Sequence, residues 1–262
     1  LLTDRAAPQL WLEFPPIDAT GTRRLLIFLH DQGGTPERFA PIAIAWQLKF
    51  PGATGIVMQA PHRFMEGHAW FDERPDRPMH DPRASLGKAN EPSDGRDRFG
   101  TVTRAERIRF ARDEIAGRIE QVQQATGLGQ AQTLIVGHGQ GGLLALELAR
   151  TPLAPAGVTL AYGSRLASVL QDGDWLSGTI HLIHGAYDSV VPVVHAQQAF
   201  RGMQALGVDV SLDILDDEAH AIGQGLVNIG TLRVMQTLFR GRSPRRLNDS
   251  GPGPSNARSL PS

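Results

Sequence analysis

The sequence lacks cysteine entirely, although it is 262 residues long. This absence excludes disulfide bonds, thiolate metal sites and a cysteine nucleophile. An excess of one charge is also missing, since 26 Lys and Arg face 27 Asp and Glu, for a net charge of −1. No field over the whole chain therefore draws it to nucleic acid or to an anionic membrane. We expect no nucleic-acid partner.

Long apolar runs are absent as well. No stretch of 18 apolar residues could span a bilayer, so we expect no stable membrane insertion. No basic segment leads into a short apolar core as in an export signal, which favours a cytoplasmic location. Hydrophobic residues still make up 41% of the chain, which argues against disorder and allows a sizeable core. The oligomeric state stays open.

Short apolar runs alternate with helical patterns along the chain. Strands are predicted over residues 9–14, 24–30, 55–59, 132–137, 157–162, 179–184 and 208–215. Helices are predicted after a capping box at Thr103 and Glu106, and over residues 141–150, 193–206 and 225–240. Such alternation is typical of a parallel sheet with helices on both faces. We therefore predict one α/β domain over residues 1–240.

Two stretches do not fit this alternation. Residues 72–104 are rich in charge and proline and show no periodicity. A loop of that length is either solvated or a functional insertion, here a cap over a site. Residues 241–262 are rich in Pro, Ser, Gly and Arg and have little to bury, so we predict a disordered tail.

A glycine-rich turn, GHGQGG at residues 137–142, follows one strand and opens the next helix. One interpretation is a dinucleotide-binding loop, G-x-G-x-x-G. That interpretation also needs an acid at the end of the next strand, and residues 157–163 contain none. The second interpretation is a nucleophile elbow, G-x-S-x-G, with Gly139 at the serine position. A glycine turn without chemistry is the third.

Two residues further along the chain favour the elbow. Asp188 follows the strand at 179–184, and His220 follows the strand at 208–215. The loops at the carboxyl ends of parallel strands meet over one crevice. The order elbow, Asp, His is the one in which an α/β-hydrolase builds its triad.

Further motifs accompany these residues in a fixed order. They are Leu29-His30 with a glycine-rich QGG after it, Ala60-Pro61 ahead of Trp70-Phe71-Asp72, the elbow itself, YGSRL at 162–166, Ile183-His184-Gly185 leading to Asp188 and Val191-Pro192, and EAHAI at 218–222. Over residues 24–240 the series resembles the phospholipase/carboxylesterase branch of the α/β-hydrolases, which includes acyl-protein thioesterases and small bacterial esterases. The resemblance implies an α/β-hydrolase fold with a mostly parallel central sheet.

The resemblance also implies roles and a substrate class. Asp188 would orient His220, the general base and acid, and the backbone N–H groups of Gln32 and Gln140 would hold an oxyanion. The substrates would be small carboxylic esters or thioesters. The substrate-binding residues would be His30, Trp70 and Phe71. No cofactor is implied.

The chain departs from the family pattern at the nucleophile. Gly139 has no side chain, so no acyl-enzyme can form there. Loss of the serine costs about 10⁶ in turnover in a well-studied protease. The family's His-Gly-x-Gly also reads His30-Asp31-Gln32-Gly33 here. If Asp31 faces the site, its carboxylate opposes a nearby oxyanion; if it faces out, it does nothing.

Three explanations follow from the missing serine. The chain could be a pseudoenzyme that binds an acyl ligand, a slow hydrolase in which His220 activates water, or an esterase inactivated by engineering or by a sequence error. Asp31 favours natural divergence, because a designer would change only the serine. Restoring that serine alone, by Gly139→Ser, is expected to raise the hydrolysis rate. No metal site is predicted, because His181 and His184 point to opposite faces of a strand.

Overall fold

A seven-stranded sheet forms the centre of the computed structural model, which describes residues 11–21, 23–74 and 102–240. Its strand order is β1-β3-β2-β6-β7-β8-β9, and only β1 runs antiparallel to its neighbour in this sheet. The strands are β1 Trp11–Phe14, β2 Arg24–Leu29, β3 Ala53–Met58, β6 Thr133–His138, β7 Val158–Tyr162, β8 Thr179–Gly185 and β9 Val210–Leu215. A separate hairpin pairs β4 His62–Phe64 with β5 Gly67–Ala69.

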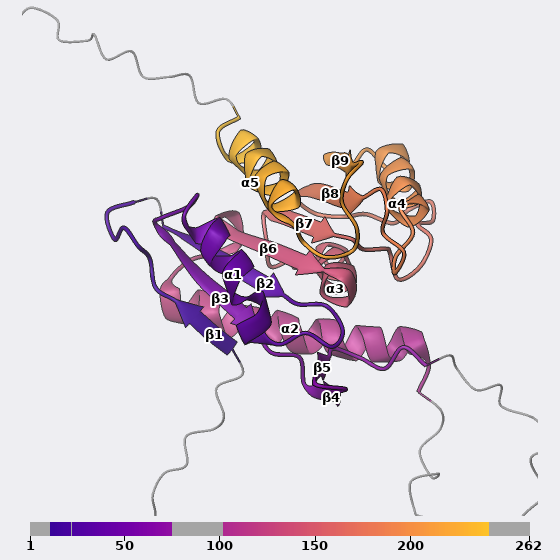
Figure 1. Ribbon diagram of the computed structural model, residues 1–262, viewed down its shortest axis with the longest axis horizontal. Helices are drawn as coiled ribbons and strands as arrows, with labels where there is room; N and C mark the ends of the chain where they lie inside the picture. The colour runs from indigo at the N-terminus through magenta and orange to yellow at the C-terminus, as the bar shows by residue number, and fades with distance from the viewer. Residues whose placement is uncertain (1–10, 22, 75–101, 241–262) are drawn as a thin grey trace, which may run out of the picture.

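Helices cover both faces of the sheet (Figure 1). They are α1 Pro36–Gln47, α2 Arg104–Thr126, α3 Gly139–Ala149, α4 Val194–Ala205 and α5 Gln224–Leu238. Side chains of α1 and α5 share one core cluster with the sheet, whereas α2 and α3 share another, and α3 and α4 a third. The central strands need near-continuous apolar sequence because both of their faces are buried. Residues 25–29 of β2 are accordingly fully buried.

The sequence predictions of fold and of the main elements are confirmed. All seven sheet strands and the four predicted helices are present, and Thr103 and Glu106 form the expected capping box. Helix α1 and the hairpin β4–β5 were not predicted. Pro41 lies inside α1, and proline usually ends a helix. The domain limits stay predictions, and the cap and tail hypotheses fall mostly on residues 75–101 and 241–262, outside the described residues.

The turn between β6 and α3 has the tight geometry of an elbow. Gly139 has a φ of 51°, in the left-handed region that strains other residues. A Cβ at Gly141 would collide with the backbone of Leu29 and His30 at the end of β2. The turn therefore lies directly against the β2 loop, and both are at the carboxyl edge of the sheet.

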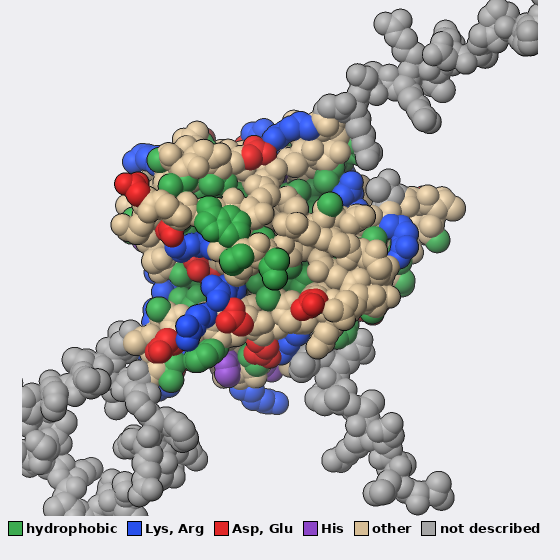
Figure 2. Space-filling model, turned by 180° about the vertical axis from the view of Figure 1, so that it is seen from behind, with side chains coloured by type: hydrophobic (Ala, Val, Ile, Leu, Met, Phe, Trp, Pro, Cys, Tyr) green, Lys and Arg blue, Asp and Glu red, His purple; other side chains and the backbone are tan. Residues whose placement is uncertain are grey.

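The surface shows no strong separation of charge. On the face shown in Figure 2, Lys and Arg side chains lie among Asp and Glu, with hydrophobic side chains between them. Within the described ranges, no helix has the length and apolar character needed to cross a membrane.

Acid is expected to destabilise the fold through His181, which is buried between Ser211 and Thr237. Burial lowers the pKa of His181 to about 4, whereas the unfolded chain binds this proton near pH 6.5. The unfolded state thus holds more protons between these values, and stability falls as the pH drops from 6.5 to 4, by about 3 kcal/mol. Urea unfolding of the chain and of His181→Gln across this range measures the effect. If both proteins lost the same free energy of unfolding between pH 6.5 and 4, the prediction would be wrong.

Candidate active site

The structure brings Asp188 and His220 together at the carboxyl edge of the sheet. Nδ1–H of His220 donates a hydrogen bond to Oδ2 of Asp188 at 2.8 Å. The Asp188 side chain is fully buried, and its Oδ1 accepts the backbone N–H groups of Val190 and Val191 at 2.9 and 2.7 Å. These bonds fix the carboxylate and, through it, the imidazole ring. The pair has the geometry of the base and its orienting acid.

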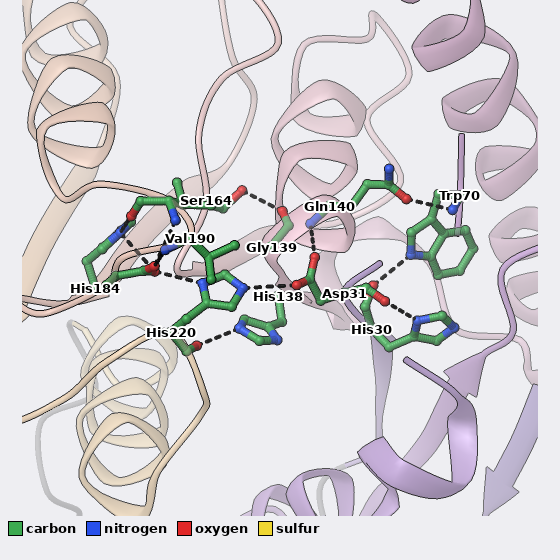
Figure 3. Close-up of polar contacts among 12 residues, drawn as sticks. His30, Asp31, Trp70, His138, Gly139, Gln140, Ser164, His184, Val190 and His220 are labelled. Atoms are coloured by element: carbon green, nitrogen blue, oxygen red, sulfur yellow. Dashed lines mark hydrogen bonds and ion pairs between the residues drawn. The ribbon is translucent and has the colours of Figure 1, made fainter. Parts of the chain in front are cut away.

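Asp31 faces the site, which decides between the two orientations considered from the sequence. Its Oδ2 lies 2.9 Å from Nε2 of His220, and its Oδ1 accepts the backbone N–H of Gln140 at 2.6 Å (Figure 3). A Cβ added at Gly139 would collide with the Asp31 carboxylate. The carboxylate thus fills the space in which a serine side chain at position 139 would stand.

Asp31 also takes the predicted oxyanion donors. The backbone N–H of Gln140 donates to its Oδ1, and the backbone N–H of Gln32 helps to lower the pKa of the same carboxylate. An oxyanion needs these donors free and aimed at the place where negative charge develops. A carboxylate already lies in that place, so a substrate oxyanion cannot use them while Asp31 stays there.

Asp31 and His220 each stabilise the charged form of the other. Burial lowers the pKa of His220, but its hydrogen bonds to Asp31 and Asp188 outweigh this effect and leave the pKa raised. Burial raises the pKa of Asp31, but His220, His138 and the backbone N–H groups outweigh it and leave that pKa lowered. The arrangement therefore favours an imidazolium between two carboxylates. A protonated His220 has no lone pair with which to accept a proton from water.

The predicted substrate-binding residues separate into two groups. Trp70 and Phe71 line a cavity of about 810 Å³ together with Gln32 and Phe110. His30 is buried and does not belong to the lining; its Nδ1–H donates to the carbonyl of Asp31 and its Nε2 accepts the N–H of Ala60. Its carbonyl in turn accepts the indole N–H of Trp70 at 2.7 Å. His30 thus supports the wall of the cavity and does not line it.

Two further residues at the site were not predicted. His138 lies beside His220, with ring centroids 4.6 Å apart, and hydrogen bonds through Nε2 to the carbonyl of His220 at 2.8 Å. His184 is buried, and its Nε2 lies 3.3 Å from Oδ2 of Asp188. In the sequence, the position of His138 inside the glycine-rich turn was the one sign that it could lie at the site. Ser164 is buried and donates to the carbonyl of Gly139 at 2.9 Å, so it does not replace the missing nucleophile.

Comparison with known proteins finds similarity in sequence to a protein family and to a curated protein. The model of the Phospholipase/Carboxylesterase family matches residues 100–229. Esterase YpfH of Escherichia coli (strain K12) is 30% identical over 131 residues, which is 50% of this chain and 56% of that protein. The match therefore spans little more than half the length of this curated relative.

Solved structures share the fold over most of the chain. Esterase PE8 superposes with a TM-score of 0.69 at 23% identity, covering 86% of this chain and 97% of that one. A Bacillus cereus carboxylesterase gives 0.64 at 12% identity, covering 86% and 93%. Arabidopsis thaliana SOBER1 gives 0.63 at 18% identity, covering 83% and 100%. These matches confirm the resemblance found in the sequence: residues 100–229 match the phospholipase/carboxylesterase family, and the chain shares the α/β-hydrolase fold of solved esterases over most of its length.

Proposed function

We propose that this chain binds small carboxylic esters or thioesters, the substrate class of the family, and hydrolyses them only very slowly because it lacks the serine nucleophile of the family's chemistry. The observation that carries the proposal is the Asp31 carboxylate, which lies in the space of the missing serine and contacts both Gln140 and His220. The acid–base pair of Asp188 and His220 is present, but the nucleophile is absent and the oxyanion site is filled.

The cavity supports a role in binding an acyl group. Trp70, Phe71 and Phe110 give it apolar walls, and Gln32 connects it to the predicted oxyanion site. Its volume of about 810 Å³ lies within the range of small-molecule pockets. A cavity with apolar walls that Gln32 connects to the predicted oxyanion site is also the observation that favours the second candidate function, a ligand-binding protein without turnover.

The steric fit between Asp31 and Gly139 supports natural divergence of this chain from the family pattern. Gly139 leaves room that the Asp31 carboxylate fills, and a serine at 139 would collide with that carboxylate. If an esterase had been inactivated by one designed change at position 139, that change would not explain the acid at position 31. The two departures from the family pattern fit each other sterically, as expected if they arose together.

The variant Asp31→Gly is expected to hydrolyse p-nitrophenyl butyrate about 10-fold faster than the unmodified chain, because it frees His220 and the oxyanion donors. A positioned base contributes about 10²- to 10⁴-fold in enzymes, and water in place of a serine recovers only part of that. The rates are measured with EDTA present. The unmodified chain is expected to stay near the uncatalysed rate.

A matched control separates base catalysis from a general opening of the site. His220→Ala in the Asp31→Gly background removes the base and is expected to abolish the gain. A fast rate in the unmodified chain would overturn the proposal, whether or not His220→Ala changes it. No gain in Asp31→Gly would favour the ligand-binding function.

A further inference from the structure

Three potential metal ligands meet at the carboxyl edge of the sheet. One carboxylate oxygen of Asp31 and one ring nitrogen each of His138 and His220 lie within 4.8 Å of one another. They come from three separate places, the end of β2, the end of β6 and the loop after β9. The comparison of His181 with His184 in the sequence could not reveal this cluster.

Hydrogen bonds fix which ring nitrogens can bind a metal. Nδ1–H of His220 donates to Asp188, so Nε2 is the ligating atom, and the metal takes the place of the proton between Nε2 and Asp31. Nε2–H of His138 donates to the carbonyl of His220, which can only accept, so its Nδ1 has the lone pair. Asp31 is held by the N–H of Gln140. Each ligand therefore has its own outer partner, as ligands of protein metal sites usually have.

We propose that Asp31, His138 and His220 form a binding site for one divalent transition-metal ion, with Zn²⁺ as the best-fitting ion. Two imidazoles and one carboxylate suit zinc better than magnesium or calcium, which prefer oxygen ligands. The proposal goes beyond the proposed function and does not depend on it.

The distances require only small adjustments. Zinc bonds of about 2.0–2.2 Å in a tetrahedral site place ligand atoms about 3.4 Å apart. Nε2 of His220 and Oδ2 of Asp31 lie 2.9 Å apart and must separate slightly, while the ligand atom of His138 lies within 4.8 Å of both. Three protein ligands leave a fourth position for water, whose pKa zinc lowers to about 7. The ion would thus offer a hydroxide beside the elbow that lacks its serine.

Calorimetric titration of the EDTA-treated, dialysed chain with ZnCl₂ at pH 7.5 tests the site. We expect one Zn²⁺ per chain with a dissociation constant of about 1 μM or below. His138→Gln and His220→Gln remove one ligand each and are expected to weaken binding by at least about 100-fold. Asp188→Asn keeps all three ligands but loses the carboxylate behind His220, which is expected to cost about 10- to 100-fold.

His195→Gln is the matched control, since His195 lies on α4 outside the cluster, and we expect it to bind zinc as the unmodified chain does. Circular dichroism shows whether each variant is folded. No binding by the unmodified chain at 1 mM ZnCl₂ would overturn the proposal, and so would His138→Gln binding as tightly as the control. Neither result would alter the rates expected in EDTA.

Discussion

The double variant Asp31→Gly/Gly139→Ser is expected to hydrolyse p-nitrophenyl butyrate at least about 10³-fold faster than the unmodified chain. The serine supplies the nucleophile whose loss costs about 10⁶ in a comparable triad. The change at position 31 clears the space for its side chain and frees the N–H of Gln140 and Nε2 of His220. We expect a rate gain smaller than this loss of about 10⁶-fold, because the residues around position 139 are not adapted to a serine.

Gly139→Ser alone is expected to stay near the uncatalysed rate, which corrects the expectation drawn from the sequence. Its Cβ would meet the Asp31 carboxylate, and the two side chains cannot occupy one place. The serine could fit only by displacing Asp31 from Gln140 and His220, which together hold that carboxylate through half-buried, charge-assisted hydrogen bonds.

The matched control is Asp31→Gly/Gly139→Ala, which has the same Cβ without the hydroxyl. Its rate is expected not to exceed that of Asp31→Gly alone. Steady-state rates of the unmodified chain and of these four variants, Asp31→Gly included, are compared with EDTA present. If Gly139→Ser alone matched the double variant, Asp31 would not be the block, and the explanation of slow turnover would have to change.

Most of the fold could be predicted because its signals are local. The buried strands are short apolar runs, as in residues 25–29, and α2 begins at a capping box that four consecutive residues specify. Helix α1 was missed because Pro41 breaks the local pattern. There, burial of Phe39 and Trp46 against the sheet overrides the local preference.

The site could be predicted in outline but not in its decisive feature. Gly139, Asp188 and His220 follow from their order along the chain, whereas the direction of Asp31 does not. That direction depends on how the β2 loop is held, and the N–H of Gly33 donates to the carbonyl of His68 in β5 while the N–H of His68 donates to Gly34. These partners lie more than 30 residues apart, so no local pattern contains them.

In the double variant, Asp188→Asn is expected to lower kcat by about 10⁴ while KM changes little. The equivalent change in a serine protease has an effect of this size because an amide donates to the imidazole and selects the wrong tautomer. Here Oδ2 of Asp188 accepts Nδ1–H of His220, and Val190 and Val191 occupy Oδ1. Because those N–H groups require an oxygen at Oδ1, the amide nitrogen of asparagine must face His220.

The split between kcat and KM distinguishes this positioning role from a structural one. Collapse of the loop after β8 would disturb binding as well as turnover and would appear in the circular dichroism spectrum and the melting temperature. A loss confined to kcat, in a folded protein, shows that Asp188 acts through His220. An unchanged kcat would mean that His220 keeps its tautomer without the carboxylate. The 2.8 Å bond between Nδ1 of His220 and Oδ2 of Asp188 would then have no catalytic role, even in the double variant.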